Sequence, residues 1–264
     1  MFSEPHLAVR IEHTIGTLDH AVDFETSAAW TVLFGASGSG KSTILRAVAG
    51  LLRPASGSIA VAGRPVFGSA RKIWIPAYAR PVRWSGQRAT LFPHLSVEQN
   101  LAFAAASVSG FSRARRKAAV TETLTHFRLQ AFRADRPAQL SGGEQQRVAI
   151  ARAALAARGN LLLLDEPFTG LDAVVRDQLI SDLRDFLGPT PVLSVSHSIA
   201  EALILKAHVL RLENGRITAQ GGAAQVLAPE IARLRATLDT ARPTKTEDRL
   251  PPSTEEAALN PARV

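Results

Sequence analysis

The chain has 264 residues, 46% of them hydrophobic, which suits one large domain or two small ones with a sizeable core. It has no cysteine, which excludes disulfides and thiolate catalysis and mildly favours a reducing compartment, and no run of about 18 apolar residues that would span a membrane. The net charge of +8 permits contact with nucleic acid or an anionic membrane surface, but the basic residues are scattered, which favours a solvated surface.

The first elements are read from hydrophobic periodicity. Residues 7–12 alternate between apolar and polar side chains, which predicts a strand. Residues 29–34 form an apolar, β-prone run, typical of a buried parallel strand. Residues 43–49 carry apolar side chains at helical spacing, and Gly50 marks the end of that helix. A strand followed by a glycine-rich segment and a helix is therefore expected early in the chain.

That glycine-rich segment fits a phosphate-binding loop: a glycine, four residues, then Gly-Lys-Ser. Glycines let backbone N–H groups point inward, Lys41 adds a full positive charge at a helix N-terminus, and the Ser42 hydroxyl is suited to hold Mg²⁺. A strand-to-helix turn that binds nothing would not need the lysine and serine together, so we predict a nucleoside triphosphate site. Its loop residues are Gly35, Ala36, Ser37, Gly38, Ser39, Gly40, Lys41, Ser42 and Thr43.

The rest of the chain alternates strands and helices, which predicts a mostly parallel α/β sheet. The basic start of the helix at 114–127 (Arg113, Arg115, Arg116 and Lys117) favours a solvated face over contact with a partner or lipid headgroups. Beyond Arg242 the chain is rich in Pro, Thr and Glu, which predicts a disordered tail. The expected elements are a hairpin at 58–67 around Gly63, strands at 161–164 and 191–196, and helices at 95–106 (N-cap Ser96), 114–127, 142–157, 173–187 and 198–205.

Two carboxylates follow the apolar strand at 161–164. Carboxylates at a buried strand end are costly unless they meet a cation. Asp165 is suited to hold Mg²⁺, and Glu166 to act as the general base that polarises the attacking water. An acidic pair that merely caps the next helix is the alternative, which the upstream phosphate loop disfavours.

A second predicted helix N-terminus also has the features of an anion-binding site. Ser141 is a predicted N-cap, and Gly142 and Gly143 leave the first N–H groups of the helix exposed, within the octet Leu140–Arg147. One nucleotide loop rarely needs a second phosphate-binding helix terminus in the same chain. We therefore predict that this terminus serves the nucleotide of another subunit.

Together with Leu171-Asp172 and His197, these motifs resemble the ATP-binding subunit of an ABC transporter, over about residues 7–238. The resemblance implies a P-loop ABC ATPase fold at 1–240, with an N-terminal antiparallel β part and a helical subdomain inserted at about 88–158, followed by the tail at 241–264. It also implies a head-to-tail dimer with ATP between Gly35–Thr43 of one subunit and Ser141–Gly143 of the other, with ATP and Mg²⁺ as cofactors.

Three further residues are assigned by the resemblance alone. Gln87 is similar to the glutamine that senses Mg²⁺ and couples to the membrane subunit, and Asp172 to the aspartate that links the two ATP sites. His197 is similar to the histidine that contacts the γ-phosphate; with Lys41 and Glu166 it completes the predicted catalytic set. The chain departs from the family in lacking an aromatic residue to stack on adenine near the end of the first strand, where only His13 is available.

The resemblance is greatest to molybdate importers, so it implies import of molybdate or a similar oxyanion, with sulfate, iron, sugar and polyamine importers as alternatives. The expected partners are a second copy of the chain, integral membrane permease subunits and, indirectly, a periplasmic or extracellular solute-binding protein, at the cytoplasmic face of the membrane. We expect the chain to lack the C-terminal oxyanion-binding domain that such subunits often carry, and hence feedback by the bound oxyanion.

Two other classes of function compete with this interpretation. An ABC ATPase that acts on nucleic acid would suit the basic charge, but no coiled coil, metal-binding insertion or tandem ATPase unit is visible, so no nucleic acid partner is expected. A P-loop kinase or GTPase would not explain the octet Leu140–Arg147.

Overall fold

The computed structural model describes residues 5–15 and 18–240, and the chain divides into two units after Ala228. The described part of the second unit is helix α8 (Ala228–Thr240). Within the described residues, no helix is both long enough and apolar enough to cross a membrane. The predicted disordered tail at 241–264 lies outside the described residues, so this assignment and the predicted domain boundary at 240 stay predictions.

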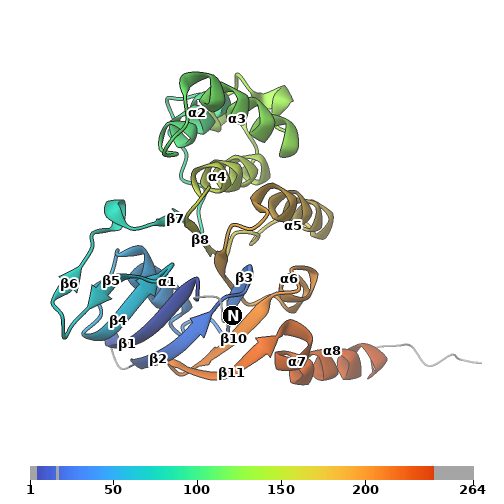
Figure 1. Ribbon diagram of the computed structural model, residues 1–264. Helices are drawn as coiled ribbons and strands as arrows, with labels where there is room; N and C mark the ends of the chain where they lie inside the picture. Colours follow the sequence, from blue (N-terminus) through green and yellow to red (C-terminus); the bar gives the residue numbers. More distant parts are fainter. Residues whose placement is uncertain (1–4, 16–17, 241–264) are drawn as a thin grey trace, which may run out of the picture. The chain divides into compact units, whose positions relative to one another are not determined.

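The first sheet of the larger unit is antiparallel and confirms the predicted N-terminal β part (Figure 1). The predicted strand at 7–12 extends to Ile15, and the predicted hairpin around Gly63 is present. The second strand of the chain was not predicted from the sequence. In spatial order the strands are β2 (Leu18–Thr26), β1 (Leu7–Ile15), β4 (Ser56–Val61), β5 (Arg64–Gly68) and β6 (Ile73–Trp74).

The second sheet carries the motifs and is parallel except at one edge. Strands β3, β8 and β9 of this sheet are fully buried and mostly apolar, as a sheet covered on both faces requires. The carboxyl ends of these strands meet at one edge, where ligands of such sheets bind. In spatial order the strands are β11 (Arg216–Gly222), β10 (His208–Glu213), β3 (Trp30–Phe34), β9 (Val192–Ser196), β8 (Leu161–Asp165) and β7 (Val82–Ser85).

Helix α1 (Lys41–Ala49) packs into one apolar core shared by both sheets. Gly50 ends it in a left-handed conformation, as predicted. Its C-terminus is also capped by Arg80, a 2% exposed residue that donates from Nη1 to Ala47 O at 2.7 Å and to Val48 O at 2.8 Å and lies 4.8 Å from the Trp74 ring centroid. Burial lowers the pKa of Arg80 to about 10, so the guanidinium is still charged at neutral pH, where the helix dipole favours it.

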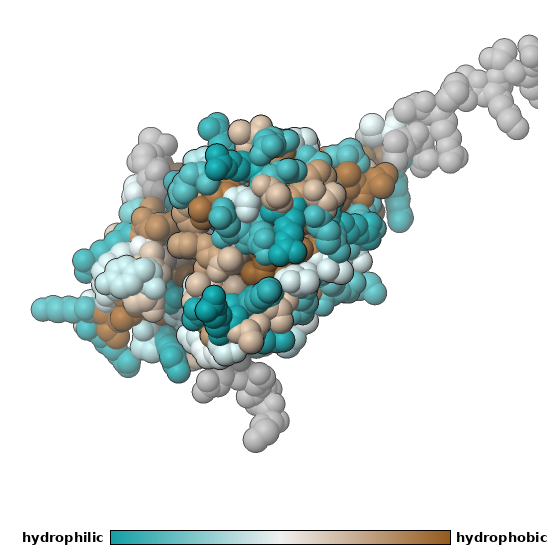
Figure 2. All heavy atoms as spheres, turned by 90° about the horizontal axis from the view of Figure 1, so that it is seen from above, coloured by the Kyte–Doolittle hydropathy of each residue, from teal (hydrophilic) through white to brown (hydrophobic). Residues whose placement is uncertain are grey.

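The predicted helical subdomain is confirmed between β7 and β8, and in Figure 1 its helices α2 (Val97–Ala106) and α3 (Arg113–His126) lie on the side of α4 (Gly142–Ala156) that faces away from the sheets. Seen from above, where α2 and α3 face the viewer, hydrophilic side chains are mixed with smaller apolar areas (Figure 2). The basic residues at the start of α3 are exposed, as a solvated face requires. The subdomain contains α2 (Val97–Ala106), α3 (Arg113–His126), two short 3-10 helices (Gln130–Phe132 and Pro137–Gln139) and α4 (Gly142–Ala156).

The remaining elements complete the larger unit. The predicted helices at 173–187 and 198–205 correspond to α5 and α6, and α6 starts one residue later than expected because Ser198 is its N-cap. The sequence analysis did not identify the last two strands or α7. The helices are α5 (Ala173–Leu187), α6 (Ile199–Ile204) and α7 (Ala223–Val226). A further 3-10 helix covers Ala77–Ala79.

Candidate functional site

The predicted phosphate loop leaves β3 and enters α1 directly. Two of its glycines are required by the surroundings. A Cβ on residue 35 would lie 2.3 Å from Leu212 O, and Gly40 has a φ of +98°. Lys41 is 5% exposed and its Nζ donates to the carbonyls of Gly35 at 2.9 Å and Ala36 at 2.8 Å, so the ammonium lies inside the loop. The loop thus holds a positive charge against its own backbone.

Opposing effects act on the pKa of Lys41. Burial lowers the pKa of Lys41, while the nearby carboxylates of Glu166 and Asp165 raise it. A buried cation bonded only to carbonyl oxygens is well suited to exchange them for phosphate oxygens, which carry full negative charge. Lys41 and the loop residues Ser37, Gly38, Gly40, Ser42 and Thr43 line a cavity of about 300 Å³ that also reaches Glu166.

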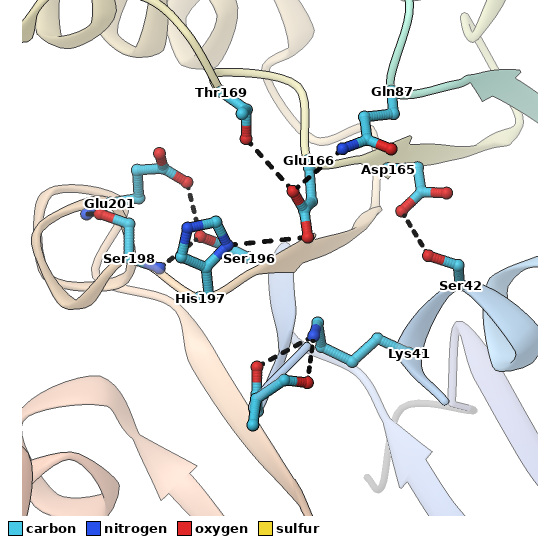
Figure 3. A network of polar contacts seen from close by, with 12 residues as sticks. Lys41, Ser42, Gln87, Asp165, Glu166, Thr169, Ser196, His197, Ser198 and Glu201 are labelled. Atoms are coloured by element: carbon cyan, nitrogen blue, oxygen red, sulfur yellow. Dashed lines mark hydrogen bonds and ion pairs between the residues drawn. The ribbon is translucent and has the colours of Figure 1, made fainter. Parts of the chain in front are cut away.

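Ser42 and Asp165 lie side by side at the start of α1 and the end of β8 (Figure 3). Ser42 Oγ donates to Asp165 Oδ1 at 2.9 Å. Asp165 is 6% exposed; its burial raises the pKa of the carboxyl, the bond from Ser42 lowers it, and the charge of Glu166 raises it further. Two neighbouring carboxylates disfavour each other's charged form, and a cation bound beside Asp165 and Glu166 would reduce that cost.

Glu166 is the centre of the network in Figure 3. Its carboxylate accepts from Gln87 Nε2 at 3.4 Å and Thr169 Oγ1 at 3.3 Å, and Oε1 lies 3.6 Å from His197 Nδ1. Its backbone φ is +46°, a strained value for a residue with a side chain, and such strain clusters at functional sites. The structure therefore brings Gln87, Glu166 and His197 together, as the resemblance implies.

Behind His197 lies a second buried carboxylate. Glu201, 7% exposed, accepts from Ser196 Oγ at 2.6 Å, and Ser196 Oγ in turn accepts from the backbone N–H of Ser198 at 2.9 Å. Burial raises the pKa of Glu201. These bonds fix the backbone on both sides of His197 and so hold its exposed imidazole at the carboxyl end of β9.

Ser141 caps α4 with a full capping box. Its Oγ accepts from Glu144 N at 3.3 Å, and its own N–H donates to Glu144 Oε2 at 2.7 Å. Gly142 would have no neighbour within 4 Å of an added Cβ, and Gly143 only Leu171 Cδ2 at 3.5 Å. Neither needs a positive φ. Nothing within the described subunit therefore explains why these residues are glycines.

Two connections were missed from the sequence. Gln146 Nε2, buried in α4, donates to Pro167 O at 2.8 Å and so ties the helix that begins at Gly142 to the segment after Glu166. Thr169 reaches the carboxylate of Glu166 directly. Gln146 lies within the predicted octet and could have been singled out there, whereas Thr169 carries no signal in the sequence.

Asp172 has a local role in the described subunit: its Oδ1 accepts from Val175 N at 3.0 Å and caps α5. It is exposed, which leaves its other oxygen open to contacts outside the subunit. The structure does not bring Asp172 or Ser141–Gly143 into contact with the phosphate loop through any described hydrogen bond or ion pair. The two sets of predicted residues thus remain separate in one subunit.

Comparison with known proteins identifies the family of the chain. The ABC transporter family matches residues 21–169, more than half of the chain. The molybdenum import ATP-binding protein ModC of Mesorhizobium japonicum is 38% identical over 219 residues, which cover 81% of this chain and 58% of that protein. The Fe(3+) ions import ATP-binding protein FbpC 2 of Rhodococcus jostii is 40% identical over 204 residues, with 76% and 56% covered. The chain thus spans somewhat more than half the length of these relatives.

A solved structure described as the ATP binding subunit of an ABC transporter has a TM-score of 0.71 and 25% identity, covering 88% of this chain and 99% of that one. The fold, the phosphate loop, the strand-end carboxylates and the family match all agree with the resemblance drawn from the motifs. The chain belongs to the ABC transporter family, as an ATP-binding subunit.

Proposed function

We propose that this chain binds and hydrolyses ATP with Mg²⁺ and thereby energises an ABC importer. The observation that carries the proposal is the convergence, at one sheet edge, of a buried lysine in a phosphate loop, a serine bonded to an aspartate, and a glutamate within reach of a histidine. These are the parts that phosphoryl transfer to water requires: a charge on the phosphates, oxygen ligands for a cation, and a base.

The residues fit Mg²⁺ by their chemistry. Ser42 Oγ and Asp165 Oδ1 are hard oxygen donors only 2.9 Å apart, and Gln87, whose amide nitrogen donates to Glu166, also carries an amide oxygen. Mg²⁺ bound there would neutralise charge on the phosphate oxygens. A binding site with few protein ligands also suits Mg²⁺, which keeps several waters and shares its coordination with phosphates.

Each side chain then has one task. Lys41 exchanges its carbonyl partners for phosphate oxygens and holds the chain of phosphates in place. Glu166 accepts the proton of the attacking water on its carboxylate, which Gln87 and Thr169 orient. His197 donates a hydrogen bond to the terminal phosphate and stabilises the charge that develops there.

A second copy of the chain completes the site in this proposal. The helix terminus at Ser141–Gly143 presents N–H groups and two glycines that the subunit itself does not require. In a head-to-tail dimer these would face the γ-phosphate held by the other subunit, and Asp172 would lie between the two sites. ATP would then stabilise the dimer, because it binds both subunits at once.

A permease is the proposed partner of a separate surface groove. A cavity of about 490 Å³ lies between β7, the segment after Gln87 and the helical subdomain, and it is lined by Trp84, Phe92, Phe103 and Arg152 among others. Phe103 is 59% exposed. An exposed aromatic beside a groove is typical of a docking site, and this groove adjoins Gln87, so partner contact and nucleotide chemistry would meet there.

We further propose that the transported solute is molybdate or a similar oxyanion and that the subunit works at the cytoplasmic face of the membrane. Several relatives are named for molybdenum import, while others of similar identity are named for iron import. The test is uptake by vesicles that contain the chain with its permease, measured with molybdate, tungstate, sulfate and ferric iron. ATP-dependent uptake of the first two supports the proposal; uptake of iron alone, or none with any solute, contradicts it.

A further inference from the structure

His20 is a buried histidine beside the phosphate loop that neither the motifs nor the proposed mechanism uses. It lies on β2, directly opposite His13 of β1 in the antiparallel pairing, and is 3% exposed. Its side chain lines the same cavity of about 300 Å³ as Lys41, Ser42 and Glu166. A polar ring thus contributes to the wall of the proposed nucleotide site from a different sheet.

The imidazole is aimed at the loop. A Cβ on residue 40 would lie 1.8 Å from Cε1 of His20, 2.5 Å from Nδ1 and 2.9 Å from Nε2. The ring edge that carries both nitrogens therefore faces the backbone of Gly40, immediately before Lys41. This close approach, together with a φ of +98°, is what requires a glycine at position 40.

One nitrogen of the ring lacks a hydrogen-bond partner among the described residues. Nδ1 of His20 is buried and has no hydrogen-bond partner within the described structure. Most buried polar side-chain atoms do have one, and an exception calls for an explanation such as a ligand that is not present. Replacement by an apolar residue of similar size would avoid the desolvation cost of that nitrogen, so the fold gives no reason for a histidine here.

The charges around His20 change when a polyphosphate binds. Burial lowers the pKa of His20, the charge of His13 lowers it further, and Asp19 raises it. A nucleotide brings several negative charges into the same cavity, and these favour the protonated ring. Charged or titratable residues close to His20 on the elements around it include His13, Asp19, Lys41 and Glu166, together with Glu213 and Arg216 at the turn that packs on its backbone.

We propose that His20 is a nucleotide-binding residue: its imidazole takes up a proton as the nucleotide binds and donates a hydrogen bond to the phosphate chain. This inference rests on the proposed nucleotide site. It predicts that affinity for nucleotide increases as the pH falls toward the range in which the free ring becomes protonated. It also assigns to β2 a role in ligand binding in addition to its role in the core.

The test compares the full chain with its His20→Leu and His20→Gln variants, using the Mg²⁺ complex of a non-hydrolysable ATP analogue as the probe. Isothermal titration at neutral pH in two buffers of different ionisation enthalpy gives both the affinity and the protons taken up. We expect His20→Leu to lose about tenfold in affinity, the effect of one charge-assisted hydrogen bond, and to take up fewer protons than wild type.

The glutamine keeps a hydrogen-bond donor and cannot titrate. His20→Gln should therefore bind with intermediate affinity and take up as few protons as the leucine variant. Thermal unfolding without nucleotide is the control for folding, and if His20→Leu does not fold, proton uptake by His20→Gln decides. Wild-type affinity and wild-type proton uptake in the folded variants would overturn the role of His20, whereas failure of the wild type to bind the probe would instead overturn the proposed function.

Discussion

The two helix N-termini that the proposed site uses contain glycine for different reasons. At the phosphate loop, Gly35 and Gly40 are enforced by their own subunit, because a Cβ would lie 2.3 Å from Leu212 O in one case and 1.8 Å from His20 Cε1 in the other. At the start of α4, Gly142 and Gly143 have ordinary φ values and room for a side chain. The first terminus is determined by internal packing, whereas nothing within the described subunit requires glycine at the second.

Replacement of Lys41 by alanine is expected to have the largest effect. The variant loses the only side-chain cation that the structure places inside the loop at Gly35 and Ala36, so ATP binding and hydrolysis should fall to background. The fold should persist, because removal of a desolvated ammonium also removes a cost. Nucleotide titration and a circular dichroism melt would check this; hydrolysis near the wild-type rate would mean that the first terminus has been misassigned.

Glu166→Gln should separate binding from hydrolysis. The amide keeps the shape and the contacts with Gln87 and Thr169 but cannot accept a proton, so turnover should fall by about 10²–10⁴-fold while ATP still binds. Trapped ATP should hold two subunits together. Size-exclusion chromatography with and without ATP measures this, with Lys41→Ala as the control that stays monomeric. A strictly monomeric Glu166→Gln that still hydrolyses ATP would exclude the shared site.

A matched pair of glycine variants tests the difference between the two helix N-termini. Gly40→Ala introduces a clash with His20 and a strained φ, so it should destabilise the subunit by about 2–4 kcal/mol. Gly142→Ala should leave stability unchanged or raise it by about 0.5–1 kcal/mol, since alanine favours the helix. Urea unfolding measures both.

ATPase activity of the Gly142→Ala variant is the second measurement on this pair of variants. If Gly142 faces a nucleotide held by another subunit, its alanine variant should lose about tenfold in ATPase activity at saturating ATP, the effect of one disturbed charge-assisted hydrogen bond, while it still binds nucleotide as a monomer. Full activity in a stable Gly142→Ala protein would remove the argument for an external ligand at this terminus.

The smallest expected effect concerns the stability of the nucleotide-free protein. Burial raises the pKa of Asp165 above its ordinary value of 3.8, so the folded state prefers the protonated acid and becomes less stable as the pH rises past that value. Asp165→Asn lacks this dependence and should gain about 1 kcal/mol at neutral pH, or about 2–4 °C in Tm. Melting curves between acidic and neutral pH would show it, and a variant with the wild-type pH dependence would contradict the assignment to Asp165.

The parallel sheet and the phosphate loop could be predicted because each is encoded locally. The run at 161–164 is apolar throughout and the run at 29–34 is apolar except for Thr31, as is typical of buried parallel strands, and the loop has a fixed spacing. The carboxyl-end rule then predicts that Asp165 lies near the loop, whereas the role of His197 was assigned from the family resemblance. Ser96 and Ser141 were recognised as N-caps because capping depends on the adjacent turn only.

The parts that could not be predicted depend on contacts distant in the sequence. The second strand, Leu18–Thr26, alternates between more and less buried positions, but polar His20 and Thr26 lie on its buried side and weaken the pattern in the sequence. The strand is paired along its whole length with β1. His20 gives no signal, because a single histidine in a strand is common and its relation to Gly40 exists only after folding. The bond from Gln146 to Pro167 O is likewise a tertiary contact between a helix and a loop.

Arg80 connects helix α1 to strand β7. Through its bonds to Ala47 O and Val48 O it anchors the far end of α1, and it immediately precedes Pro81 and the strand that leads to Gln87. A charge buried in this way is costly to detach, so α1 and the start of β7 are expected to move as one rigid body. A displacement of the phosphate loop would then move α1, the start of β7 and, through β7, Gln87. A bound nucleotide could in this way change the shape of the groove beside Phe103.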